Sequence, residues 1–311
     1  MIFAPTYLTT ELVRDRWPAD GHAIGVGVAG GFFPYDFDEF RAGNHKERES
    51  FWGHGGETTF TYYRRLKIAE LLPIEGQLRL RPQYVVYQRS WETAPQFRLP
   101  VDTAIYSARA GVRVGGEPPE LLPDVALEAS LWYEVSYRQN ADPYGFAEAP
   151  IRIEHTTQRA WARGGGIITV TKTHTARVFL TAGAAHTPDA LSSFRLGSAL
   201  PFRHEFPLVL HGYYVDEVFA RRFWLLNASY RFPLWPGSER VRLQLAWDYA
   251  HIDYLEGHAL PRRTLRGVGM KLTVALTPRT MLILGYGYGL DAPRDGRFGG
   301  HEASALIEFK F

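Results

Sequence analysis

Apolar and polar residues alternate with a period of two along most of the chain, in segments of ten to fifteen residues. In segment 125–137, Leu127 and Leu131 fall on one face while Glu128 and Glu134 fall on the other. Successive side chains of a β-strand point to opposite faces, so this pattern predicts strands with one apolar and one polar face. The same alternation recurs at 78–89, 241–249 and 301–311.

The alternating segments predict an all-β chain of about twelve strands. They lie at roughly 23–33, 57–70, 77–91, 102–115, 124–138, 156–170, 176–187, 221–234, 240–254, 264–277, 280–290 and 301–311. Short turns such as WPGSE and TPRT alternate with longer polar connections at 34–56, 92–101, 139–155, 188–220, 255–263 and 291–300. Short turns on one rim and long loops on the other are typical of transmembrane antiparallel up-and-down β-barrels, with the turns in the periplasm and the loops outside the cell.

A soluble β-sandwich is the alternative, because alternation alone does not say which face is inside. The lumen of a twelve-stranded barrel is too wide for side chains to fill as a dry core, so polar residues inside and apolar residues toward lipid are expected there. Aromatic residues make up 14% of the chain, with 17 Tyr and 8 Trp, which suits aromatic girdles at the membrane interfaces. These observations favour the membrane barrel, with outer-membrane lipid and lipopolysaccharide as surroundings.

Composition narrows the functional classes. The chain has no cysteine and a net charge of only +2, so thiolate chemistry is excluded and no basic field indicates nucleic acid binding. The first residues lack the layout of a secretory signal, and we expect that a signal has been removed from an outer-membrane protein. Residues 1–22 are expected to form an N-terminal periplasmic segment, and residues 23–311 the barrel, with a long inward-folded loop at 188–220.

No motif predicts an enzyme or a cofactor. The glycines of GVGVAGG have dinucleotide-fingerprint spacing, but no helix follows them, so small residues on a lumen face are the better interpretation. No G-x-S-x-G motif is present, and a lipid-modifying enzyme remains only a remote alternative. His251, Asp253 and His258 are the nearest candidates for metal ligands, but carboxylates and histidines in loops are usually just solvated, and no metal site is predicted.

The predicted polar face carries many basic residues. We call the following side chains the lumen basic set: Arg65, Lys67, Arg79, Arg81, Arg109, Arg113 and Arg242. One interpretation is a lumen that favours anions, because rings of Arg or Lys set such selectivity. The other is a network of ion pairs that stiffens or seals the barrel, with partners such as Glu128 and Glu134. The sequence leaves both open.

The last third of the chain contains FPLVLHGYYVDEVFARRFWLLNASYRFPL, LQLAWDYAHI and RRTLRGVGMKLTVALTPRTMLILGYGYGL. From about residue 192 it resembles the C-terminal barrel of the outer-membrane assembly and secretion superfamily, the bacterial surface antigen group. In that family an Arg-Gly-aromatic tip of a long loop reaches into the lumen and contacts an aspartate of a wall strand. The resemblance therefore implies that His211, Gly212 and Tyr213 form the tip and contact Asp248, with histidine in place of arginine.

The resemblance covers about 120 residues. The chain departs from the family in two respects. It has about twelve predicted strands where the family usually has sixteen, and no periplasmic substrate-binding repeats precede them. The resemblance implies a non-enzymatic barrel that acts as an export pore or as a membrane anchor for partner proteins, with a partner protein in or under the barrel. The alternative is a porin-like channel for small solutes that leans toward anions.

Overall fold

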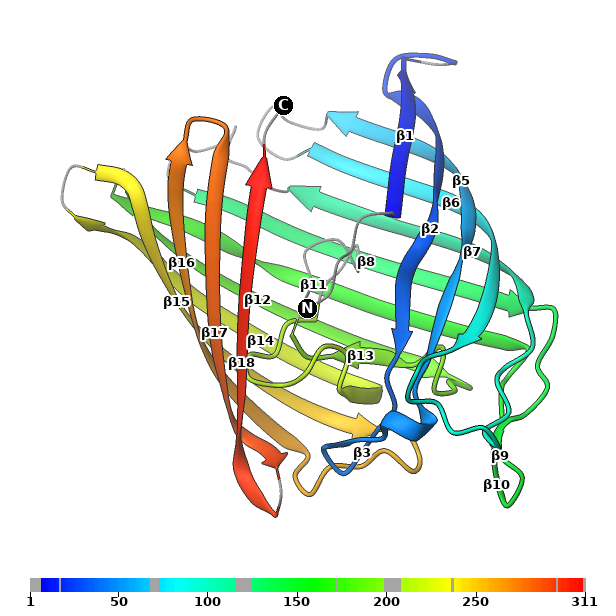
Figure 1. Ribbon diagram of the computed structural model, residues 1–311. Coiled ribbons are helices and arrows are strands. Elements are labelled where there is room, and N and C mark those ends of the chain that lie inside the picture. Colours follow the sequence, from blue (N-terminus) through cyan, green and yellow to red (C-terminus); the bar gives the residue numbers. More distant parts are fainter. Residues whose placement is uncertain are drawn as a thin grey trace.

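The computed structural model describes residues 7–16, 18–67, 73–115, 125–171, 173–198, 208–235, 238–294 and 296–309. Long antiparallel strands dominate it (Figure 1). The main sheet follows the chain in order through β1 (Tyr7–Asp15), β2 (His22–Phe37), β5 (Phe51–Lys67), β6 (Pro73–Arg89), β7 (Thr103–Gly115), β8 (Val125–Arg138), β11 (Thr156–Thr171), β12 (His174–His186), β14 (Val218–Trp235), β15 (Ser238–Tyr254), β16 (Thr264–Thr277), β17 (Thr280–Arg294) and β18 (Arg297–Phe309).

Short elements complete the architecture. The three-residue strand β13 (Phe194–Leu196) pairs with β14 and makes the main sheet fourteen-stranded. Two small hairpins lie in the long connections, together with the 3-10 turn η1 (Glu47–Glu49). They are β3 (Phe40–Arg41) with β4 (Asn44–His45), and β9 (Tyr144–Phe146) with β10 (Ala149–Ile151). Within the described residues, no helix has the length and apolar character needed to cross a membrane.

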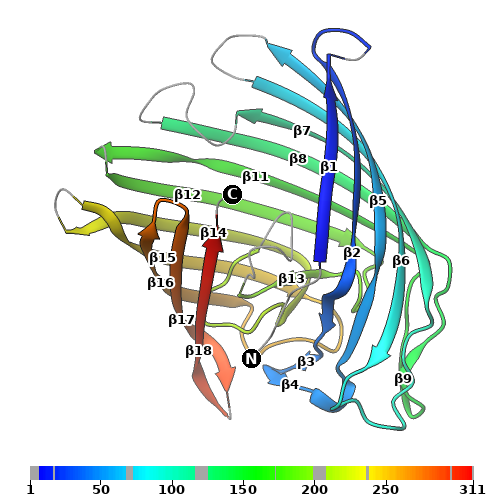
Figure 2. The ribbon, with the colours of Figure 1, turned by 45° about the horizontal axis from the view of Figure 1, so that its top comes forward.

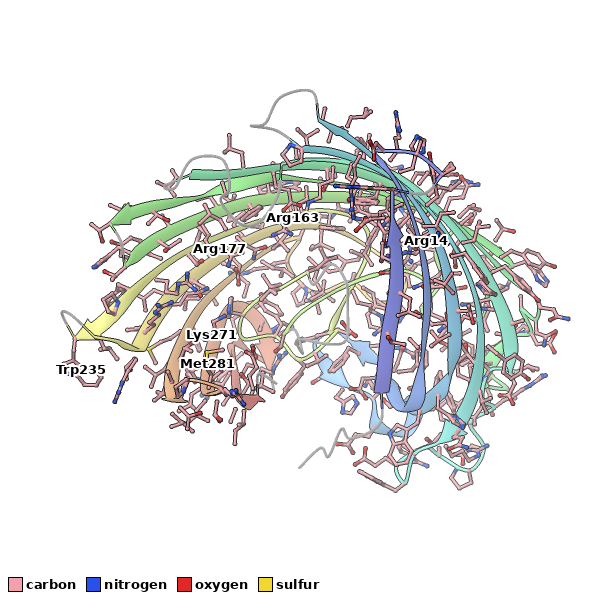
Figure 3. All side chains as sticks on the ribbon, turned by 90° about the horizontal axis from the view of Figure 1, so that it is seen from above. Arg14, Arg163, Arg177, Trp235, Lys271 and Met281 are labelled. Carbon is pink, nitrogen blue, oxygen red and sulfur yellow. The ribbon has the colours of Figure 1, made fainter. Side chains whose placement is uncertain are left out.

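The main sheet curves around a concave inner side (Figures 1 and 2). Each strand pairs antiparallel with its neighbour in sequence, and within the described residues the path has β1 and β18 as its two ends. Seen from above, Arg163, Arg177 and Lys271 lie on the inner side, whereas Trp235 lies at the tip of the β14–β15 hairpin (Figure 3). This is the up-and-down antiparallel architecture that the alternation predicts.

All twelve predicted strands are present, with boundaries that shift by a few residues, and two expectations were wrong. Part of the segment that was expected to lie in the periplasm, residues 1–22, is the strand β1, which pairs with β2 from Tyr7 opposite Gly31 to Asp15 opposite Ala23. The expected long connection at 291–300 is instead a tight hairpin, because β17 continues to Arg294 and β18 begins at Arg297. The ladder at this end pairs Arg294 with Arg297.

The apolar face of the wall strands points outward, as predicted. On β8, Leu127 and Leu131 are 59% and 58% exposed, whereas Glu128 and Glu134 on the opposite face are buried. Leu245 on β15 is likewise exposed. Soluble proteins do not leave a continuous band of large apolar side chains in water, and lipid is the solvent that such a band requires.

The buried apolar residues gather where loops cover the inner face. One cluster joins Trp132 and Trp161 of the wall to Leu196, Leu210 and Tyr213, which belong to the connection between β12 and β14. A second cluster joins Phe51 of β5 and Tyr87 of β6 to Phe97 and Tyr144 of the long connections. The connections are thus packed against the wall rather than extended away from it.

Candidate functional site

The connection between β12 and β14 folds into the space enclosed by the sheet (Figures 1 and 2). We call its described residues, 187–198 and 208–217, the inward loop; residues 199–207 lie outside the described part. Parallel bridges join Gly197 to Val209 and Ser198 to Val215, so the two arms of the loop hold each other. The expected loop, 188–220, ends three residues later than the observed one, because Val218 already begins β14, and begins one residue later, because β12 ends at His186.

The tip of the inward loop binds Asp248 of β15. The backbone N–H of His211 donates to Oδ2 of Asp248 at 2.8 Å, and the imidazole Nδ1 donates to the same oxygen at 2.6 Å. Asn227 of β14 donates to the other oxygen, Oδ1, at 2.7 Å, and also to the carbonyl of Val209 at 3.0 Å. Asp248 is 1% exposed, so the bonds to its carboxylate are shielded from water. The contact implied by the resemblance is present.

Gly212 and Tyr213 continue the tip. Gly212 has φ +79°, in the left-handed region that favours glycine, and its N–H donates to Oε2 of Glu302 on β18 at 3.3 Å. The other oxygen of Glu302 accepts from the hydroxyl of Ser198 in the other arm. Tyr213 is completely buried, and its hydroxyl has no hydrogen-bond partner among the described residues. The tip is therefore attached to both β15 and β18.

Glycines of the wall make room for the tip. A Cβ at Gly269 of β16 would overlap the ring of His211. On β17, a Cβ at Gly287 would lie 2.5 Å from the nitrogen of Gly212, and one at Gly289 would lie 2.8 Å from its oxygen. Glycine within a strand often marks a place where another backbone approaches closely. These glycines, which we call the glycine cradle, are what allow the loop backbone to lie directly on the sheet.

A buried ion pair fixes the end of the inward loop. Both oxygens of Glu217 bind Arg294 of β17, each at 2.7 Å, in the bidentate geometry that makes such pairs strong. Oε2 also accepts the N–H of Tyr214 at 2.7 Å, and the guanidinium lies 4.1 Å from the centre of that ring. Burial raises the pKa of Glu217 above its ordinary value, and the bonds from Arg294 oppose that shift. The end of the loop is thus attached to β17, in addition to the contacts of the tip with β15 and β18.

The long connections meet at the rim beyond the loop. His258 Nε2 lies 2.8 Å from Oε1 of Glu39, and its ring stacks on Phe219 with centroids 4.2 Å apart. Burial raises the pKa of Glu39, but the contact with His258 and the charges of Arg195 and Arg41 together outweigh it, and the pKa falls below its ordinary value. This contact joins residues 219 positions apart in sequence.

The metal-ligand candidates of the sequence have separate partners. His258 binds Glu39, Asp253 binds Arg221 at 3.1 Å, and His251 lies 3.5 Å from the hydroxyl of Thr264. Within the described residues, no group of three or more His, Asp or Glu side chains has an arrangement that could hold a metal ion.

The described side chains of the lumen basic set have polar partners across the strands. Arg65 binds Asp15 at 2.7 Å and Glu75 at 2.8 Å. The remaining contacts are Arg79 with Thr61 at 3.2 Å, Arg81 with Glu134 at 3.9 Å, Arg109 with Gln77 at 3.2 Å and Arg113 with Glu128 at 3.6 Å. Arg242 is half-buried on β15, and the side chain of Lys67 lies outside the described part. Arg65, Arg81 and Arg113 thus pair with carboxylates, as the ion-pair interpretation expects, whereas Arg79 and Arg109 bind the uncharged side chains of Thr61 and Gln77.

Sequence reasoning did not connect the loop to Asn227, Glu302 or Arg294. The alternating glycines of RGVGM and LGYGYGL were the available signal for the cradle, because period two puts them on one face. Glu217 and Arg294 are 77 residues apart, and no local spacing indicates their pairing.

An antiparallel sheet with an apolar outer face and a loop packed inside it is the fold of an outer-membrane β-barrel. Barrels of the outer-membrane secretion and assembly superfamily are among the solved structures that it resembles. No family model matches the sequence, and no curated protein matches it either.

Three of these solved structures are similar over nearly all of the chain. CdiB from Acinetobacter baumannii superposes with a TM-score of 0.62 over 97% of this chain at 11% identity, and CdiB from Escherichia coli with 0.61 over 94% at 11%. BamA from Haemophilus ducreyi lacking POTRA domains 1–3 gives 0.59 over 96% at 9%. The match covers 49%, 51% and 62% of those chains respectively, so this chain spans about half of their length. The likeness is one of fold.

Proposed function

We propose that this outer-membrane barrel serves as an export pore or a membrane anchor for partner proteins, and that the inward loop closes its lumen at rest. The observation that carries the proposal is the attachment of the loop tip to the wall through His211 and Asp248. The fold shared with CdiB and BamA supports the same role. Outer-membrane lipid and lipopolysaccharide would surround the apolar outer face.

The contacts of the inward loop suit a reversible closure. They include hydrogen bonds to Asp248 and Glu302 and the ion pairs of Glu217 with Arg294 and of Asp189 with Arg138, all of which a polypeptide entering the lumen could replace with polar contacts of its own. The apolar residues Leu196 and Leu210 of the loop are fully buried in a cluster with residues of the wall. Their exposure on opening has a free-energy cost, which keeps the resting state closed.

Two measurements test the proposal. The first is purification of the barrel from its native membrane and identification of the proteins that copurify with it. An anchor or export role predicts one partner polypeptide in stoichiometric amount. The second is conductance in planar lipid bilayers, where the wild type should be mostly closed and a His211→Ala variant should open more often. A barrel that purifies without a partner protein and gives a steady current in the bilayer would contradict the proposal.

A channel for small anions is the second candidate. It is favoured by the number of arginines on the inner face, because basic residues that line a pore attract anions. The same conductance recordings separate the two candidates: a stable, anion-selective current through the wild type supports the channel, whereas a closed wild type supports the export or anchor role.

A further inference from the structure

A β-bulge turns two consecutive arginines toward the outer face of the wall. Residues of a regular strand alternate between the two faces, but the pairing of β14 with β15 shifts between Ala220 and Arg222. Ala220 and Phe223 are buried, whereas Arg221 and Arg222, which lie between them, are both exposed. A bulge can direct a side chain to a place that a regular strand does not allow. This bulge therefore concentrates positive charge at one point of the outer face.

The two arginines share one acidic neighbour. Arg222 lies opposite Asp253 of β15 in the ladder, but Asp253 forms its ion pair with Arg221, at 3.1 Å. On the other side, the residue opposite Arg222 is the uncharged Ala184 of β12. Within the described part of the chain, the guanidinium of Arg222 has no hydrogen bond or ion pair. One positive charge is therefore in excess at this point of the outer face.

Stacked rings on the same face indicate the depth of this charge. Trp224, two positions along β14 from Arg222, is exposed, and its ring stacks on Tyr249 of β15 with centroids 5.1 Å apart. The ring of His251 stacks on the same indole at 6.3 Å. Trp and Tyr on the outer face of a barrel gather where lipid meets water. A strand rises about 3.3 Å per residue, so Arg222 lies about 7 Å closer to the rim, at the depth of lipid headgroups.

The rim in question is the one that carries the long connections. β14 begins at Val218, directly after the inward loop, and β15 ends at Tyr254, before the connection 255–263. Long loops of outer-membrane barrels face the outside of the cell. Lipopolysaccharide forms that side of an outer membrane, and its lipid anchor carries phosphate groups on a sugar backbone with several acyl chains. Deeper in the wall, Leu180 of β12 is 48% exposed and offers an apolar surface to such chains.

We infer that Arg222 and His251 bind a phosphate group of lipopolysaccharide, with Arg221 beside them. A guanidinium matches the geometry of phosphate oxygens. The hydroxyl of Thr264 lies 3.5 Å from Nδ1 of His251, which leaves Nε2 to donate to a phosphate oxygen. The inference rests on the outer-membrane location of the barrel and not on the export or anchor role, so either can fail without the other. It assigns a specific site to a lipid that would otherwise only surround the barrel.

Native mass spectrometry of the whole purified barrel in detergent tests the inference. The probe is lipid A with both phosphates, and lipid A without phosphate is the uncharged analogue. We expect saturable binding of the phosphorylated lipid and much weaker binding of the analogue. Because a basic residue beside an anionic lipid contributes a factor of about five in affinity, Arg222→Gln should raise the dissociation constant about fivefold. Asp253→Asn should lower it by about the same factor, because this change releases Arg221 from its ion pair.

Arg279→Gln is the matched control. Arg279 is an exposed arginine in the turn between β16 and β17, on the opposite rim, so this variant loses the same charge at a distant place. It should leave the affinity unchanged. Lack of saturable binding, equal weakening by Arg222→Gln and Arg279→Gln, or an Asp253→Asn barrel that binds no more tightly than the wild type would overturn the inference. Displacement of the lipid by an equimolar amount of inorganic phosphate would show a site for the free anion and overturn the assignment to lipopolysaccharide.

Discussion

Asp248 accepts two hydrogen bonds on a single carboxylate oxygen from one residue, His211: one from the backbone N–H at 2.8 Å and one from the imidazole at 2.6 Å. The backbone bond needs no particular side chain, whereas the imidazole bond is stronger when the ring is protonated. Arginine, which the resemblance places at this position in the assembly and secretion superfamily, keeps its charge at every physiological pH. Histidine makes the attachment of this loop titratable.

Asp248→Asn should loosen the inward loop. Removing the charge weakens bonds that each contribute about 1.5–3 kcal/mol, so the amides of residues 208–217 should exchange hydrogen about tenfold to a hundredfold faster. Hydrogen exchange with mass spectrometry measures this. Asp253→Asn is the control, because Asp253 lies on the same strand but binds Arg221 near the rim. Equal exchange in Asp248→Asn and the wild type would contradict the assignment of this contact.

The attachment should weaken as the pH rises. Burial lowers the pKa of His211, but the hydrogen bond and the charges of Asp248 and Glu302 outweigh it, and the pKa lies above its ordinary value. A raised pKa means that the stabilisation is complete below about pH 6.5 and is lost as the pH rises through the raised value. The protection of residues 208–217, corrected for intrinsic exchange, should therefore fall over this range.

His211→Arg is the matched variant for the pH experiment. Its guanidinium stays protonated, so the protection of the loop should not change with pH over the same interval. Wild-type protection that is constant, or that increases with pH, would show that His211 does not control the attachment.

The glycine cradle should tolerate no side chain. Gly269→Val places methyl groups where the His211 ring lies, and we expect the tip to be displaced and the pore to open more often in bilayer recordings. Gly164→Val on β11 is the control, because a Cβ there meets nothing closer than 3.9 Å. A Gly269→Val barrel that stays as closed as the Gly164→Val barrel would show that the tip does not depend on the cradle.

The strands and their faces were predictable because period-two alternation is a local property that survives any tertiary arrangement. β1 was not, since its neighbouring residues Leu12 and Val13 are both apolar and both exposed, and alternation is lost there. The tip contact followed from the resemblance, not from spacing. The pairing of Glu217 with Arg294 across 77 residues depends on how the loop crosses the lumen, which no local pattern encodes.

On the outward face, the loss of stability caused by a charged side chain should depend on how deep that side chain lies in the membrane. Leu131 lies in the middle of β8 and is 58% exposed, so Leu131→Arg should destabilise the barrel by about 2–4 kcal/mol in lipid. Leu276 is also exposed but lies at the end of β16, where Leu276→Arg should cost only about 0–1 kcal/mol. Reversible urea unfolding in lipid vesicles measures both. Equal costs at the two positions would argue against a lipid boundary.

Cross-linking in native membranes tests most directly whether the inward loop lies against the wall. The chain has no cysteine, so paired cysteines can be introduced without background. Ser198→Cys with Glu302→Cys replaces a hydrogen-bonded pair that joins the loop to β18. Ser107→Cys with Ser136→Cys is the reference, because these hydroxyls lie 2.8 Å apart on β7 and β8 of the wall. We predict that a short thiol cross-linker joins both pairs efficiently; cross-linking of the reference pair alone would contradict a loop held inside the barrel.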